Sequence, residues 1–128
     1  HNFYDIHAIK EFASFRKPGR PRLTAAEGYA TMLATQTLND PEVLFEGGVC
    51  LQENGRQLSG RIPVAQALQQ LLRTAQRVSV DEQLSSDDNS KSFILYSLYR
   101  QDGVLRLLDI VTTGREGKIL AVYRSEII

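Results

Sequence analysis

The side chain with the most distinctive chemistry in this sequence is Asp109, an acid within an apolar row. Residues 104–113 read as a strand, in which successive side chains point to opposite faces, so Leu105, Leu107 and Val111 share the face of Asp109. Burying a carboxylate is costly unless it is paired, hydrogen-bonded or held neutral. Asp109 is therefore a candidate general acid or base, and its apolar neighbours are expected to favour the neutral form.

Tyrosines supply the other candidates. Tyr29 lies on an apolar helical stripe, where its phenol could polarise a substrate, or could equally be a core residue whose hydroxyl is satisfied at the rim. Tyr96 and Tyr99 have opposite facings, and Tyr99 is preferred for the pocket because it shares parity with Phe93 and other apolar residues. Tyr123 is either pocket wall or dimer contact. Asp109 and Tyr29 are thus the catalytic candidates, and the expected ligand-binding side chains are Tyr99, Tyr123, Phe45, Met32 and Leu107.

A structural role is the alternative for Asp109, because perturbed carboxylates also occur in ion-pair networks. Its partner would then be Arg106, Arg115 or Arg124. A second titratable group within hydrogen-bond reach of Asp109 would favour catalysis. An isolated or arginine-paired carboxyl would favour binding or structure.

The elements that position these residues follow from the spacing of apolar side chains. Thr24 and Glu27 have the spacing of a capping box, Asn54-Gly55 is a strong hairpin turn, and Gly47-Gly48 indicates a bulge. A basic, exposed connector at 16–22 separates a short helix that begins near Asn2 from the rest of the chain. The other helices are expected at 24–38 and 63–76, and the strands at 43–52, 78–84, 93–100, 104–113 and 119–128.

Short connections between the last four strands leave no room for crossover helices. The sequence therefore predicts an α+β fold, a curved antiparallel sheet packed against three helices. With 128 residues, of which 42% are hydrophobic, the chain is expected to be a single domain over 1–128.

Composition argues against several classes of partner. Fifteen basic and fifteen acidic residues leave no net charge, so neither nucleic acid nor a membrane surface is expected, and no apolar run approaches the roughly 18 residues of a span. Gly19-Arg20-Pro21 is similar to the core of an AT-hook, but Pro18 departs from that motif and a solvated loop is the better interpretation. The single Cys50 and two histidines give no metal-ligand cluster and favour a cytoplasmic location, and no cofactor is expected.

The order of elements over 24–128 resembles the nuclear transport factor 2-like (SnoaL-like) superfamily. Ser59-Gly60-Arg61 resembles the start of the family's third helix, and residues 109–119, D-I-V-T-T-G-R-E-G-K-I, resemble its penultimate hairpin. The resemblance implies a cone-shaped fold with Asp109 facing an apolar cavity, a small and largely apolar ligand, and a homodimer formed through the outer face of the sheet. It also implies a cofactor-independent lyase, isomerase or hydrolase, or alternatively a non-catalytic ligand-binding or dimerisation domain.

Two departures from the family's enzymes affect the expected chemistry. In ketosteroid isomerases the matching aspartate is held protonated, and the catalytic base stands at the position of Gly47, which has no side chain here. The neighbouring Glu46 would replace that base only if a bulge turned it inward. For the Asp-Arg-Asp arrangement of limonene epoxide hydrolases, this sequence offers no second inward aspartate.

Overall fold

A computed structural model describes residues 24–127 of the chain. The expected first helix and the basic connector at 16–22 lie outside these residues. The helices are α2 (Ala25–Thr35), α3 (Pro41–Leu44) and α4 (Arg61–Arg73), and the strands are β1 (Phe45–Glu53), β2 (Arg56–Ser59), β3 (Arg77–Ser85), β4 (Lys91–Arg100), β5 (Gly103–Thr113) and β6 (Ile119–Ile127).

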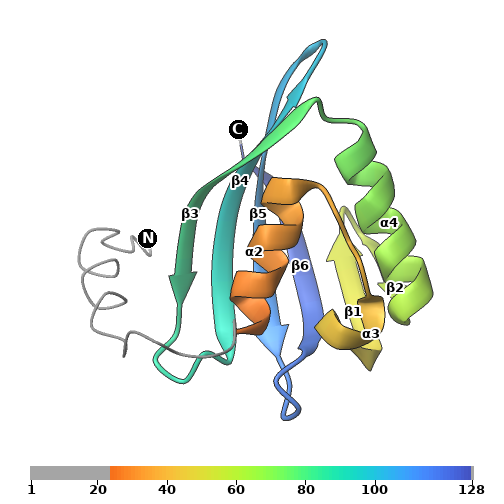
Figure 1. Cartoon of the computed structure of the whole chain (residues 1–128), viewed down its shortest axis with the longest axis vertical. Coiled ribbons are helices and arrows are strands. Elements are labelled where there is room, and N and C mark those ends of the chain that lie inside the picture. Colours follow the sequence, from red (N-terminus) through yellow and green to blue (C-terminus); the bar gives the residue numbers. More distant parts are fainter. Residues whose placement is uncertain (1–23, 128) are drawn as a thin grey trace.

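One six-stranded sheet in the order β2-β1-β6-β5-β4-β3 forms the frame of the fold. All neighbouring strands are antiparallel except β1 and β6, which run parallel. The sheet is curved, and α2, α3 and α4 lie on one side of it (Figure 1). The predicted α+β class and the meander from β3 to β6 are confirmed. The parallel pairing was not predicted, because the sequence left open where the first hairpin joins the sheet.

Helix α2 is fixed at both ends, and this holds Tyr29 in place. At its start the backbone N–H of Glu27 donates to Thr24 Oγ1 at 3.1 Å and the backbone N–H of Thr24 donates to Glu27 Oε1 at 2.8 Å, which confirms the predicted capping box. At its end Gln36 has a left-handed backbone, and its side-chain amide donates to the carbonyls of Leu72 and Ala75, both at 2.9 Å. These two bonds join the end of α2 to the end of α4.

The first hairpin agrees with its predicted turn and bulge. Asn54 and Gly55 both have positive φ, 48° and 74°, as a type I′ turn requires. The register of β1 against β6 shifts between Phe45 and Cys50, a segment that contains Gly47-Gly48. The short helix α3 was not predicted. It begins at Pro41 after an Asp40 cap and includes Val43 and Leu44, which were expected at the start of the strand.

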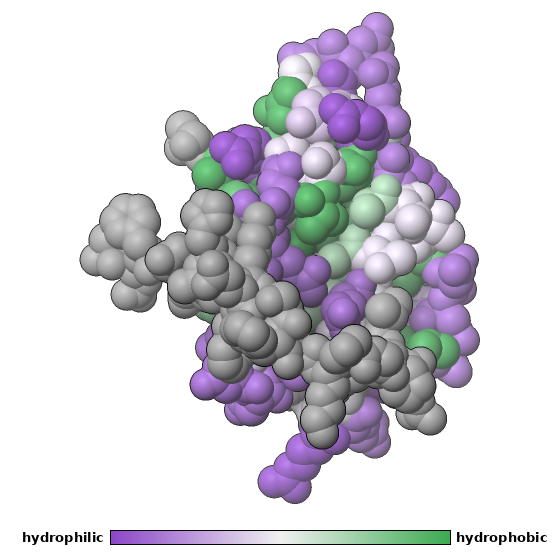
Figure 2. Space-filling view, turned by 60° about the vertical axis from the view of Figure 1, so that its left-hand side comes forward, coloured by the Kyte–Doolittle hydropathy of each residue, from purple (hydrophilic) through white to green (hydrophobic). Residues whose placement is uncertain are grey.

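The core lies between the helices and the inner face of the sheet. It consists mainly of side chains with almost no exposed surface, among them Tyr29, Leu33, Phe45, Leu51, Leu68, Ile94, Tyr96 and Val111. In the view that brings the β3 edge of the sheet forward, hydrophobic side chains gather near the middle and hydrophilic ones lie around them (Figure 2). Within residues 24–127 no helix is long and apolar enough to cross a membrane.

Candidate functional site

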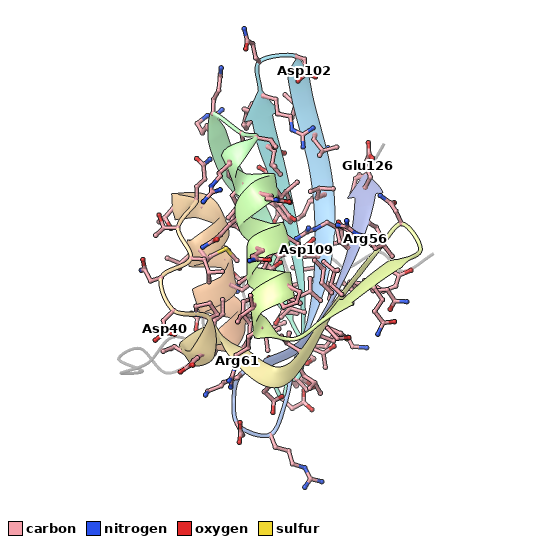
Figure 3. All side chains as sticks on the ribbon, turned by 90° about the vertical axis from the view of Figure 1, so that its right-hand side faces the viewer. Asp40, Arg56, Arg61, Asp102, Asp109 and Glu126 are labelled. Carbon is pink, nitrogen blue, oxygen red and sulfur yellow. The ribbon has the colours of Figure 1, made fainter. Side chains whose placement is uncertain are left out.

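Asp109 lies on β5 in the interior of the molecule, with 0% of its surface exposed. Its strand partners are Ile94 on β4 and Arg124 on β6, and residues directly opposite in an antiparallel pair share a face. The row of Leu107, Asp109 and Val111 is buried, as the alternation predicted. Figure 3 places Asp109 beside α4, on the side of the helix toward the sheet.

An arginine on the next strand is the main partner of Asp109. Arg124 donates from Nε to Asp109 Oδ1 and from Nη2 to Asp109 Oδ2, both at 2.9 Å. This is the two-pronged geometry that a planar guanidinium makes with a carboxylate. Among the three arginines that the sequence offered as partners, the structure therefore selects Arg124.

Two tyrosines complete the surroundings of the carboxylate. Tyr29 on α2 donates from its hydroxyl to Asp109 Oδ2 at 2.6 Å. The hydroxyl of Tyr96 on β4 lies 3.0 Å from each of the two carboxylate oxygens of Asp109. Donors from α2, β4 and β6 thus converge on a single acid from β5.

The network reaches the surface through alternating charges. Arg124 Nη1 donates to Glu53 Oε2 at 3.3 Å, and Arg56 donates to Glu53 Oε1 at 2.8 Å. Side-chain exposure rises along this series from 0% for Asp109 to 4% for Arg124, 20% for Glu53 and 61% for Arg56. Only its outer members contact solvent freely, so the inner pair is weakly screened.

Burial and charge fix the protonation states of the donors. Burial raises the pKa of Tyr29 and of Tyr96 well above the usual value, and the negative charge of Asp109 raises both further. Burial alone would lower the pKa of Arg124, but the charge of Asp109, the two phenols and the hydrogen bonds to Asp109 together outweigh burial and raise that pKa well above its usual value. Both phenols remain hydrogen-bond donors and the guanidinium remains charged over the ordinary pH range. The two titratable groups within reach of Asp109 therefore keep their protons there, and the arginine-paired alternative describes the site.

This arrangement fits an ionised Asp109. Its oxygens accept from two nitrogens of a cation and from two hydroxyls, and a carboxylate has about four acceptor positions to offer. The neutral carboxyl that we expected does not fit this geometry, because Arg124 supplies the compensating charge. The sequence could not show this pairing. Asp109 also has 0% of its surface exposed, so solvent does not reach its carboxylate in this conformation.

The tyrosine expected in the pocket was the wrong one of two. Tyr96 pairs with Leu107 and faces Asp109, whereas Tyr99 pairs with Val104 on the opposite face of the sheet. There the guanidinium of Arg77 lies 3.9 Å from the centre of the Tyr99 ring, a cation–π contact. The alternation of side chains could not identify the inner face of β4, because this strand carries apolar side chains on both faces.

The remaining ligand-binding candidates divide between the outer face and the core. Tyr123 pairs with Ile110 on the outer face and is 52% exposed, so it is not a wall of a pocket that contains Asp109. Phe45, Met32 and Leu107 are buried in the core. All three belong to one cluster of buried side chains, which also contains Tyr29 and Tyr96.

A small cavity opens beside Glu53 and Arg124, and we call it the rim cavity. Its volume is about 160 Å³, and it is lined by Glu53, Asn54, Leu71, Leu105, Leu107, Arg124 and Glu126. Ligand pockets commonly enclose about 300–1,000 Å³, so this one can hold only a very small molecule or one end of a larger one. Of the predicted ligand-binding residues, Leu107 is the one that lines it.

Glu46 does not join Asp109. Among the described residues, one of its carboxylate oxygens is buried without a hydrogen-bond partner, close to Gly114 in the turn between β5 and β6. Gly114 follows Asp109 by five residues, which corresponds to roughly 16 Å along a strand. The two carboxyls therefore cannot act as a pair on one substrate atom, and the bulge in β1 does not restore an isomerase base.

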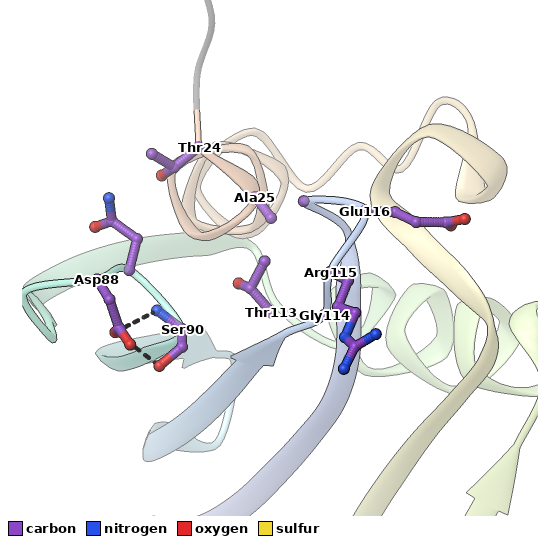
Figure 4. Close-up of a pocket in the computed structure, with 10 residues that line it drawn as sticks. Thr24, Ala25, Asp88, Ser90, Thr113, Gly114, Arg115 and Glu116 are labelled. Carbon is purple, nitrogen blue, oxygen red and sulfur yellow. Dashed lines mark hydrogen bonds between the residues drawn. The ribbon is translucent and has the colours of Figure 1, made fainter.

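A separate groove lies at the end of the sheet near the start of α2 (Figure 4). It has a volume of about 450 Å³ and is lined by Thr24, Ala25 and residues 88–90 and 113–117. Asp88 there accepts the backbone N–H and the hydroxyl of Ser90, and with a further hydrogen bond from Ser86 these lower its pKa to about 2. In the part of the chain described, no three His, Cys, Asp or Glu side chains are grouped to hold a metal ion.

Comparison with known proteins identifies the fold. No sequence-family model and no curated protein sequence matches the chain. A steroid delta-isomerase from Pseudomonas aeruginosa matches at TM-score 0.72 and 15% identity, over 81% of this chain and 77% of that one. An NTF2-like protein of unknown function from Exiguobacterium sp. 255-15 matches at TM-score 0.59 and 16% identity, over 81% and 98%.

A SnoaL-like family protein from Agrobacterium tumefaciens strain C58 is a third such structure, at TM-score 0.63 and 17% identity, over 83% of this chain and 100% of that one. All three identities are too low to carry function, and what these structures share with the chain is the backbone arrangement. The expected architecture is therefore confirmed at the level of the fold.

Proposed function

From the nuclear transport factor 2-like fold of this chain and the position of its rim cavity, we propose that it is a non-catalytic binding domain for a small, largely apolar molecule. The observation that carries the proposal is the state of Asp109. Its carboxylate is enclosed and already bonded to Arg124, Tyr29 and Tyr96, so it cannot exchange a proton with a bound molecule. The network instead holds Arg124 rigidly at the wall of the rim cavity.

The lining of the rim cavity defines the kind of ligand. Leu71, Leu105 and Leu107 offer an apolar surface, which favours a hydrocarbon portion. Arg124 Nη1 has two N–H groups, and within residues 24–127 its hydrogen bond goes to Glu53 alone. The second N–H suits a carbonyl or hydroxyl oxygen. Glu53 and Glu126 at the same cavity disfavour an anion, so the ligand is neutral.

Binding at the rim cavity is tested by titrating isotope-labelled protein with small neutral ketones, alcohols and amides at millimolar concentration. Amide signals of Asn54, Leu105 and Glu126 should shift together and saturably. Leu105→Trp, which fills the cavity, should abolish the shifts. Val43→Trp is the control, because Val43 is 70% exposed on α3 and lies outside the lining of the rim cavity. Unchanged binding by Leu105→Trp, or no shift with any compound, would contradict the proposal.

A homodimer is the second candidate, and the outer face of the sheet favours it. Val104 and Tyr123 are 56% and 52% exposed there, and the strand register places several half-buried apolar side chains on the same face: Phe93, Leu95, Leu108, Ile110 and Ile127. Apolar side chains gathered on one exposed face are typical of an interface. We propose that two copies pack through this face.

We also propose that the protein works in the cytoplasm, as its single cysteine suggested.

A further inference from the structure

We propose that Tyr29, Tyr96 and Arg124 form a receptor for a small carboxylate, and that the chain fills this receptor with its own Asp109. The two hydroxyls and the guanidinium supply donors at 2.6–3.0 Å from the carboxylate oxygens. They come from α2, β4 and β6, whereas the acid comes from β5. In chemical terms Asp109 is a ligand tethered to the backbone. We call the three donor side chains the carboxylate cradle.

The carboxylate cradle has supports that do not involve Asp109. Tyr29 is carried by a helix that is capped at its start and joined to α4 through Gln36 at its end. Tyr96 is on a strand that is paired on both sides. Arg124 is also held by Glu53 on β1. The donors are therefore positioned largely by the frame of the fold, as preorganised binding requires.

The chemistry of the cradle selects a monocarboxylate. A bidentate guanidinium matches two oxygens in one plane, and both phenols donate. A neutral amide of the same shape would present N–H groups to donors. The site is buried, so a charged ligand that satisfies it gains from the low local dielectric while an empty site leaves Arg124 uncompensated.

The size of the ligand is set by the side chain that is removed. Asp109→Ala removes the carboxyl group and leaves room for formate, whereas Asp109→Gly also removes Cβ and leaves room for acetate. The rim cavity provides a route, because Leu107 and Arg124 line it and also border Asp109. This proposal does not depend on a natural ligand at the rim cavity.

Thermal unfolding of the two variants tests the proposal. Sodium formate should raise the melting temperature of Asp109→Ala saturably by several degrees above sodium chloride at the same ionic strength, and acetate should do the same for Asp109→Gly. Acetamide should have no such effect, and wild type should not respond to either carboxylate. Adding Tyr29→Phe and Tyr96→Phe to Asp109→Ala should weaken the response to formate.

Both variants leave a buried arginine unpaired and can fail to fold in chloride. In that case they are refolded from urea in formate or acetate, and recovery of a native circular dichroism spectrum in the carboxylate alone supports the receptor. Equal behaviour in carboxylate and chloride, whether folded or unfolded, overturns it. A response that is equally large in the variant lacking both phenols also overturns it, because the tyrosines would then not be part of the site.

Discussion

Replacing Asp109 by asparagine should strongly destabilise the fold. The change keeps the shape of the side chain but puts an amide where two donor atoms of Arg124 now meet a carboxylate at 2.9 Å. Hydrogen bonds to charged groups contribute about 1.5–3 kcal/mol each. Removing one partner of a buried ion pair costs about 3–5 kcal/mol because the other charge is left uncompensated. We expect the free energy of unfolding to fall by about 3–5 kcal/mol at pH 7.

Urea denaturation measures this loss. With an m-value of about 2 kcal/mol per molar, the midpoint should move by roughly 1.5–2.5 M while the m-value stays constant. Asp102→Asn is the matched control, since Asp102 is an exposed acid in the turn between β4 and β5 and its change should stay within about 0.5 kcal/mol. A loss below about 1 kcal/mol for Asp109→Asn would refute the ion pair. It would instead favour the neutral carboxyl that the sequence suggested.

Three further predictions concern pH, the end of α2 and the outer face. The raised pKa of Tyr29 means that its contribution to stability is present below its unfolded value of 10.0 and is lost as pH rises beyond it; Tyr29→Phe should flatten this alkaline loss in urea melts between pH 9 and 11, and an unchanged alkaline loss in the variant would contradict this assignment. Gln36→Gly keeps the left-handed backbone but removes two hydrogen bonds, so unfolding should become about 1–2 kcal/mol easier; no loss would mean that water replaces them. Sedimentation should show a wild-type dimer at micromolar concentration and a monomer for Tyr123→Glu, and a wild-type monomer would contradict the proposed interface.

Local sequence signals predicted the frame of the fold well. The capping box at Thr24 and the Asn54-Gly55 turn act within a few residues, so their chemistry is visible in the sequence. The burial of Asp109 followed from strict alternation on one strand. The short helix α3 was missed because Val43 and Leu44 fit an alternating strand equally well, although Asp40-Pro41 offered a cap and a first-turn proline.

The partners of Asp109 were harder to predict, because they depend on pairing between segments far apart in the chain. Arg124 was one of three possible arginines, and only the register of β5 against β6 places it opposite Asp109. Tyr96 was not predicted as the inward tyrosine, because its strand carries apolar side chains on both faces. The signal that would have indicated Arg124 is a basic residue on the same face of its strand as buried apolar residues. On β6, Arg124 shares the buried face with Val122.

A double-mutant cycle between Asp109 and Arg124 tests most directly whether this acid is a structural ion-pair partner. Urea unfolding is measured for wild type, Asp109→Asn, Arg124→Gln and the double variant at pH 7 and constant salt. We predict a coupling of at least about 2 kcal/mol, with the double variant losing much less stability than the two single losses combined. Single losses that simply add would show that the two side chains act independently, and would contradict the conclusion that Arg124 holds Asp109 as a buried carboxylate.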